Sequence, residues 1–299
     1  MTTAASGARK APVTSGASPQ AGGSATGNPR KASGALPGPL SLGLARGGTE
    51  LRQFFRHKEQ VVFTFSLPAV LMILLGSILD GPTALAGVTS GQLLAAGMIG
   101  SGIVSTSFNS IATGVSADRE TGALKRLRGT PMPSSSYFIG KMVLVAVSSL
   151  AQTVLMSAVA VLLFGLKLPT EPEKWLTLLW VFALGIVSCT LLGIALSSLA
   201  KSTTGAVAVV QMLYLVLQFI SGVFVTPITN LPKIMVDIAS FFPLKWICQG
   251  FRSVFLPDGA VGMEMAGSWE LPRVALVLGI WCVVGAVLAR LSFRWTDTK

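Results

Sequence analysis

Charge is the scarcest property of this sequence. Only 12% of its 299 residues are charged, about half of the roughly 25% found in soluble domains. Histidine occurs once, at His57, and the three cysteines, Cys189, Cys248 and Cys282, include no CxxC pair. An odd number of cysteines does not suit a disulfide framework. A histidine-based metal site and a serine–histidine dyad both lack their components, so we expect neither a bound metal nor a catalytic residue.

The motifs of nucleotide-binding proteins and hydrolases are also missing. The nearest match to a G-x-x-x-x-G-K-[ST] phosphate-binding loop is Gly140–Lys141–Met142, which has neither the upstream glycine nor the hydroxyl residue. No G-x-S-x-G nucleophile elbow occurs. We therefore expect a chain that is not an enzyme and that binds no cofactor of its own.

Long apolar runs dominate what is present. The mean hydropathy is +0.68, and uncharged windows predict six membrane-spanning helices, at approximately residues 61–79, 92–115, 142–166, 175–200, 202–225 and 274–290, the last ending at Arg290. The first window would span about 28 Å as a helix, close to the ~30 Å hydrocarbon core of a bilayer. The predicted fold class is therefore an all-α membrane protein.

The middle of each window contains no Asp, Glu, Lys or Arg. Ionisable groups inside spans form the proton or ion relays of secondary transporters. Because such a relay is absent, uphill transport by this chain would need energy from a partner.

The distribution of Lys and Arg predicts the orientation of the spans. If the amino terminus lies inside, the inner segments hold 13 basic residues and the outer segments six, which places both termini in the cytoplasm. Residues 1–38 are rich in small residues and proline and predict a disordered cytoplasmic tail, which leaves residues 39–299 as the membrane domain. The basic residues that give the chain its net charge of +11 flank the apolar spans. We therefore expect contacts with anionic membrane lipids and none with nucleic acid.

The longest outer segment, residues 226–273, contains two short helical patterns. Asn230 is expected to cap the first, in which Ile234, Ile238 and Phe241 share a face. The second covers residues 246–255, and each is too short to cross a membrane. We expect short interfacial or re-entrant helices before the last span; the alternative is an amphipathic loop that packs on the outer helix ends.

The inner loop Ser116–Lys141 carries the most informative pattern. Leu124 and Leu127 lie on one face of a short predicted helix, and basic residues occupy its other faces: Lys125, Arg126 and Arg128. Gly129, Pro131 and Pro133 then end the helix. This element could dock onto a partner through its leucine face, or it could be a basic loop that follows the positive-inside rule.

An amphipathic helix is predicted before the first span, over residues 39–58. Its two faces are apolar (Leu44, Leu51, Phe54, Phe55) and basic (Arg46, Arg52, Arg56, Lys58). Such a helix lies in the plane of the membrane interface. Gly47–Gly48 is expected to interrupt it.

Small and polar residues recur inside two of the apolar windows. In the second, Gly97, Ser101 and Ser105 have the four-residue spacing that lets helices pack closely. Polar or aromatic side chains follow in the second and fifth windows: Phe108, Asn109, Gln211, Tyr214 and Gln218. Uncharged polar groups at membrane depth face either a partner helix or a cavity, so both close packing and a substrate path are open interpretations.

Two stretches resemble the ABC-2 type transporter permeases. Arg119–Leu124, with Leu127, Thr130–Pro131 and Gly140–Lys141, resembles that family's loop between its second and third spans, although Ala123 stands where the family usually has Thr. Phe242–Trp246 and Gly250–Arg252 resemble its segment before the last span. The resemblance covers roughly residues 40–295 and is greatest to actinobacterial permeases of the daunorubicin-resistance type.

The resemblance implies roles for individual residues. The loop would be a coupling helix that docks on an ABC ATPase subunit, with the contributing residues Arg119, Glu120, Leu124, Lys125, Leu127 and Arg128. The segment 39–58 would be an elbow helix, with Leu51, Arg52, Phe54 and Phe55. The second and fifth spans would line a substrate path at a dimer axis, with Phe108, Asn109, Gln211, Tyr214 and Gln218. The Glu120 carboxylate would anchor the end of the second span.

The function that the resemblance implies is export across a bacterial plasma membrane. ATP and magnesium would bind a separate ATPase subunit, and a second permease copy, in a homodimer or a heterodimer, would complete the path. The favoured substrate is an amphipathic, antibiotic-like small molecule, with a lipid, polysaccharide or glycoconjugate as the alternative. A membrane carrier not driven by ATP, or a membrane enzyme, is the competing class, and the uncharged spans argue against both.

Overall fold

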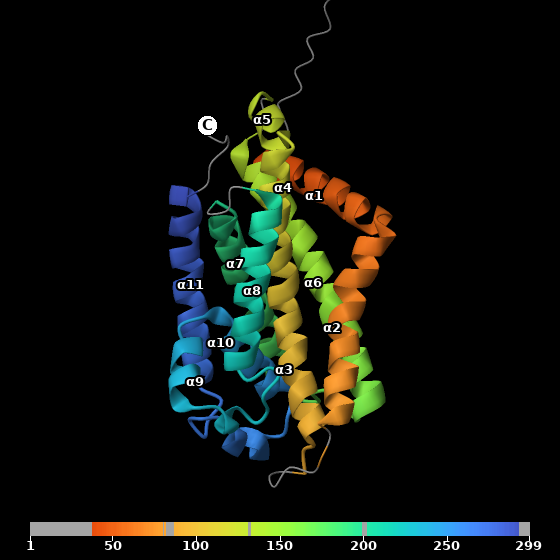
Figure 1. The fold of residues 1–299 in the computed structure, drawn as a ribbon, viewed down its shortest axis with the longest axis vertical. Helices are drawn as coiled ribbons and strands as arrows, with labels where there is room; N and C mark the ends of the chain where they lie inside the picture. The colour runs from red at the N-terminus through yellow and green to blue at the C-terminus, as the bar shows by residue number, and fades with distance from the viewer. Residues whose placement is uncertain (1–37, 80, 82–86, 131–132, 199–201, 293–299) are drawn as a thin grey trace, which may run out of the picture. The chain divides into compact units, whose positions relative to one another are not determined.

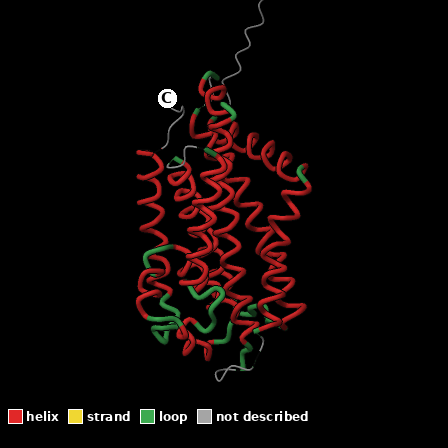
Figure 2. Tube along the Cα trace, viewed as in Figure 1, coloured by secondary structure: helices red, strands yellow, loops and turns green. Residues whose placement is uncertain are grey.

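The structure is a computed structural model that describes residues 38–79, 81, 87–130, 133–198 and 202–292. Within these ranges the regular elements are all helical (Figure 1 and Figure 2). They are α1 (Pro39–Arg56), α2 (Lys58–Ile78), α3 (Ser90–Val104), the π-helical turn η1 (Ser105–Asn109), α4 (Ser110–Glu120), α5 (Ala123–Arg128), α6 (Ser134–Phe164), α7 (Pro172–Ser197), α8 (Thr203–Ile220), the 3-10 turn η2 (Ile228–Asn230), α9 (Lys233–Ala239), α10 (Pro243–Phe255), the 3-10 turn η3 (Asp258–Met263) and α11 (Leu271–Ser292). The predicted tail, apart from Gly38, lies outside the described residues.

Five of the described helices are long and apolar enough to cross a membrane: α2, α6, α7, α8 and α11. They coincide with five of the predicted windows, with shifted ends. Helix α6 begins at Ser134 instead of residue 142, and α8 ends at Ile220 instead of residue 225. The earlier end of α8 has a local cause, because Gly222 adopts the positive φ of 69° that commonly follows a helix.

The second predicted window, residues 92–115, is covered by α3, η1 and α4 in direct succession. Thr89 and Gln92 start α3 with a reciprocal capping box, in which each side chain accepts a hydrogen bond from the other's backbone amide at 3.2 Å. Gly91 and residues 93–104 are all buried, because α2, α6, α7 and α10 surround α3. The π-helical turn then interrupts the regular α-helix.

The segment before the last span combines one exposed and one buried helix. On α9, Ile234 and Ile238 are exposed, as is Phe241 after it. Helix α10 is buried over its whole length and packs on α3, α7 and α11. A Cβ atom at Gly100 of α3 would lie 3.1 Å from the Cα atom of Cys248, so the small residue permits this close approach. Of the two predicted alternatives, burial excludes an interfacial location for α10 and is compatible with a re-entrant helix.

The predicted cap of the first short helix is also wrong. Asn230 ends the 3-10 turn η2, and Pro232 is the residue that precedes α9. Proline suits this position because its fixed φ is compatible with a helix start and its missing amide leaves no donor unpaired.

Helix α1 corrects the prediction that Gly47–Gly48 interrupts the amphipathic segment. The helix runs unbroken from Pro39 to Arg56, and its buried residues are Gly43 and Gly47. A Cβ atom at Gly43 would lie 2.5 Å from Cγ2 of Ile139, and one at Gly47 would lie 2.6 Å from Cβ of Val143. These glycines therefore let α1 pack directly on α6, and that contact outweighs their low helix propensity.

Gly47→Ala is expected to destabilise the protein by about 1–3 kcal/mol, because the added methyl group has no space against Val143. Gly48→Ala is the matched control, since no atom lies within 4 Å of a Cβ atom there. That change should stabilise the helix by up to about 1 kcal/mol. The thermal unfolding midpoint of the detergent-solubilised chain measures both, and equal midpoints would contradict the close packing of α1 on α6.

Candidate functional site

The predicted coupling loop forms the short helix α5 at one end of the helix bundle (Figure 1). Gly122, with φ of 71°, makes the turn between α4 and α5. Leu124 is 0% exposed and belongs to the core, Leu127 packs partly against that core, and Lys125 and Arg126 are exposed. Arg128 is the last residue of α5.

The burial of Leu124 corrects the predicted docking face. We expected both leucines on the outer surface of the loop, but Leu124 anchors α5 to its own chain. Lys125, Arg126 and part of Leu127 are exposed on α5.

Arg119 holds the end of the neighbouring helix α7. Its side chain is buried and donates hydrogen bonds from Nη1 to the Ser197 carbonyl at 2.8 Å and from Nη2 to Ser198 Oγ at 3.5 Å. A cation at this position neutralises the negative end of the α7 dipole and satisfies a terminal carbonyl.

Glu120 binds the start of α8. Its Oε2 accepts a hydrogen bond from the backbone amide of Thr203 at 2.8 Å, and Ser202 Oγ accepts one from the Gly205 amide at 3.1 Å. Hydrogen bonds from Thr203 lower the pKa of the Glu120 carboxyl below its ordinary value. The carboxylate is therefore ionised at neutral pH, and this contact is lost only when the pH falls through that lowered pKa.

A charged cluster that joins both ends of the loop Ser116–Lys141 to α1 was missed in the sequence. Lys141 Nζ lies 3.2 Å from Glu50 Oε2 and 2.9 Å from Asp118 Oδ2, and Tyr137 donates a hydrogen bond to Asp118 at 2.9 Å. Arg46 pairs with Glu50 at 3.1 Å and lies over the Tyr137 ring. These contacts join α1, α4 and α6. These residues are far apart in the sequence, so their spacing does not predict contact. The one available signal was that acidic and basic residues both occur beside the apolar windows.

The predicted elbow residues are divided between exposed and partly buried positions on α1. Arg52 and Phe55 are exposed, and Leu51 and Phe54 are partly buried. The Phe54 ring packs edge-on against Phe55, and against Phe65 of α2. The aromatic residues therefore support the junction between α1 and α2.

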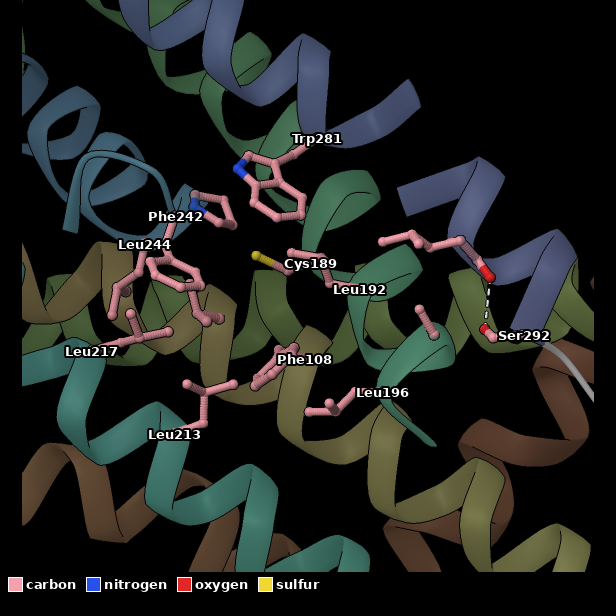
Figure 3. A pocket seen from close by; sticks show the side chains of 14 residues that line it. Phe108, Cys189, Leu192, Leu196, Leu213, Leu217, Phe242, Leu244, Trp281 and Ser292 are labelled. Atoms are coloured by element: carbon pink, nitrogen blue, oxygen red, sulfur yellow. Dashed lines mark hydrogen bonds between the residues drawn. The ribbon is translucent and has the colours of Figure 1, made fainter. Parts of the chain in front are cut away.

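The predicted substrate-path residues do not converge on one surface. Asn109 donates a hydrogen bond to exposed Gln211 at 2.9 Å, which joins η1 to α8. Tyr214 and Gln218 are buried, and the Tyr214 hydroxyl donates to the Ser101 carbonyl of α3 at 3.2 Å. Phe108 points instead into an apolar groove (Figure 3). Two predicted residues, Phe108 and Asn109, belong to the π-helical turn, a feature frequent at functional sites.

This groove contains about 790 Å³ of empty space and is lined by residues of η1, α7, α8, α10 and α11. Figure 3 shows Phe108, Leu213, Leu217, Phe242 and Trp281 around it. Its few polar groups include Ser292 Oγ, which already donates to the Leu288 carbonyl at 2.6 Å. A ligand there would have to be apolar, because a polar group would lose its hydrogen bonds to water without replacement.

A polar hollow of about 1600 Å³ lies between α1, α2, α4 and α6. It is lined by the charged side chains Glu50, Asp118 and Lys141 and by hydroxyl groups such as Thr106 and Ser148. The π-helical turn η1 contributes to both, with Thr106 lining the polar hollow and Phe108 the apolar groove.

A buried ion pair at the opposite end of the bundle was also missed. Arg252 Nε lies 2.5 Å from Glu264 Oε1, with both side chains at most 3% exposed, and Arg252 Nη1 donates to the Gly222 carbonyl at 3.3 Å. Both charges fall in the segment 226–273, which was predicted to lie outside the membrane. The pair ties α10 to the loop after η3 and to the residues that follow α8.

The described residues hold no group of three His, Cys, Asp or Glu side chains that could bind a metal ion. The arrangement offers a projecting basic loop, helix contacts that lead from it into the bundle, and hollows of contrasting polarity.

A search of curated proteins finds no match to the chain. The family model described as ABC-2 type transporter matches residues 47–256, more than two thirds of the 299 residues. The match includes α2 to α10, and therefore the predicted coupling loop, the π-helical turn and the buried ion-pair residue Arg252. The chain is a multi-pass membrane protein, and it belongs to the ABC-2 type transporter family.

Proposed function

We propose that the chain is the permease subunit of an exporter driven by ATP that a separate subunit hydrolyses. Six crossings would place both termini in the cytoplasm, with the sixth made by α3, η1 and α4. The described chain ends, at the start of α1 and the end of α11, lie at the same end of the bundle as α5 (Figure 1). This arrangement supports an even number of crossings and a docking loop on the side of the termini.

The observation that carries the proposal is the construction of the coupling loop. Helix α5 is anchored by buried Leu124, and α4 before it is tied to α7 and α8 by Arg119 and Glu120. A loop that served only to place positive charge near lipid would need none of these fixed contacts. The exposed side chains Lys125 and Arg126 face away from the core and are free to meet an ATPase subunit.

The elbow role of α1 is part of the proposal. Helix α1 exposes Leu40, Leu44 and Phe55 while Gly43 and Gly47 pack on α6. Large exposed apolar groups on a helix that is too polar to cross suit the membrane interface. In this position α1 would be held against α6 and the charged cluster at the base of the coupling loop.

The proposed substrate is an amphipathic small molecule of the antibiotic type. The apolar groove would suit the apolar part of such a molecule and the polar hollow its polar part. The daunorubicin-resistance subtype stays a prediction from the sequence resemblance. A lipid or glycoconjugate is the second candidate, favoured by an apolar groove lined by helices that expose large apolar side chains. A second copy of the chain would enclose the path.

ATP-dependent uptake of daunorubicin into inside-out membrane vesicles tests the proposal. Vesicles that contain the chain and its ATPase subunit should accumulate the fluorescent drug with ATP and magnesium, and not with a non-hydrolysable ATP analogue. The chain purified alone should hydrolyse no ATP. Hydrolysis by the chain alone would contradict the two-subunit assignment, and uptake of a labelled lipid in place of the drug would select the second candidate.

A further inference from the structure

Three consecutive charged residues at the end of α4 contact three different helices. Asp118 accepts a hydrogen bond from Tyr137 of α6 at 2.9 Å, Arg119 donates to the last carbonyl of α7 at 2.8 Å, and Glu120 accepts from the first amide of α8 at 2.8 Å. The last turn of α4 therefore distributes its contacts over α6, α7 and α8, immediately before the turn into α5.

The signs of the charges match the helix ends that they meet. The carboxyl end of a helix carries partial negative charge and the amino end partial positive charge. Arg119 meets the carboxyl end of α7, and Glu120 meets the amino end of α8. Exchange of the two charges would place each beside a like partial charge, so these contacts depend on the order of the residues.

The main neighbour of α8 is α4. Helix α8 contacts η1 and α9 less, and α7 and α10 only lightly, whereas α7 packs extensively on α11. A large part of its surface is exposed, including Met212, Leu215 and Val216. A helix held mainly by one neighbour can move with that neighbour without opening the rest of the core.

We infer that Arg119 and Glu120 are positioning residues that pass a displacement of α5 to the α7–α8 junction, so that α8 moves when the ATPase subunits close. This inference rests on the proposed function and adds which helix the loop drives. Glu120 holds α8 directly, and Arg119 keeps the end of α7 in register with it. Because α8 carries Gln211, Tyr214 and Gln218, movement of its first turn would reach the predicted substrate path.

Pulsed electron–electron distance measurements on the dimer bound to its ATPase subunits test this inference. One spin label is placed at Thr130→Cys, just after α5, or at Thr204→Cys, in the first turn of α8; both positions are exposed. The native cysteines are replaced by alanine. Addition of ATP, magnesium and vanadate should change the distance between the two copies at both positions.

Glu120→Ala should preserve the nucleotide-dependent change at position 130 and abolish the change at position 204. Because Glu120 is exposed, its loss leaves the core intact. Glu120→Gln keeps an oxygen that accepts from the Thr203 amide and should restore most of the response. Glu173→Ala removes an acidic residue from the first turn of α7 and serves as the matched control without effect.

An unchanged response at position 204 in Glu120→Ala would overturn the inference while leaving the proposed function in place. A loss of response at both positions in Glu120→Ala alone would also overturn it, because the residue would then act in docking. The absence of any response in the unsubstituted chain would reject the proposed function, and the inference with it.

Discussion

Leu127→Asp is expected to abolish recovery of the ATPase subunit with the chain. Leu127 is a large apolar residue of α5 that retains exposed surface beside Lys125 and Arg126. A carboxylate without a partner at a closed interface costs several kcal/mol, and each 1.4 kcal/mol weakens binding about tenfold. We therefore expect at least a 100-fold weaker complex, measured as co-purification of the ATPase subunit with the tagged chain.

Two further variants separate a loss of docking from a loss of folding. Leu127→Met keeps an apolar side chain of similar volume and should retain the ATPase subunit. Leu124→Asp should also lower the thermal unfolding midpoint of the isolated chain, because Leu124 is 0% exposed within its own core. Full recovery of the ATPase subunit with Leu127→Asp would favour the alternative of a basic loop near the membrane.

Glu264→Ala is expected to destabilise the chain by about 3–5 kcal/mol, because it leaves Arg252 buried without its carboxylate. The Arg252 guanidinium would keep only its contact with the Gly222 carbonyl, which is too little for a charge that is 2% exposed. The thermal unfolding midpoint of the detergent-solubilised chain measures the loss.

The double variant Arg252→Met with Glu264→Leu removes both charges and should unfold close to the temperature of the unsubstituted chain. Asp237→Ala breaks the exposed Lys233–Asp237 pair on α9 and should cost less than about 1 kcal/mol. A similar midpoint for Glu264→Ala and Asp237→Ala would show that the Arg252–Glu264 pair is hydrated and contributes little.

The long helices were accessible from the sequence because burial in a membrane needs only length and uniform apolarity. Five of the six windows became single helices of membrane-spanning length. The amphipathic pattern of residues 39–58 and the short pattern of residues 246–255 also became helices. The predicted interruption of α1 at Gly47–Gly48 was wrong. The low helix propensity of glycine can be read from the sequence, whereas the close packing of α6 on α1 cannot.

Apolarity alone could not indicate which apolar surface faces lipid and which faces protein. Helix α10 has the composition of an interfacial segment, yet α3, α7 and α11 enclose it. Leu124 and Leu127 look equivalent in the sequence, yet one is fully buried and the other is not. Such differences depend on neighbours that are distant in the chain.

The sequence by itself determined the helical class, the apolar windows and the position of the basic loop, since each follows from local composition and spacing. Only the tertiary structure decided that Asp118, Arg119 and Glu120 contact three different helices and that Arg252 finds Glu264 in the core. The physical reason is that a charge or a helix end can be satisfied by any complementary group that the fold brings within hydrogen-bond distance, and sequence spacing does not encode that proximity.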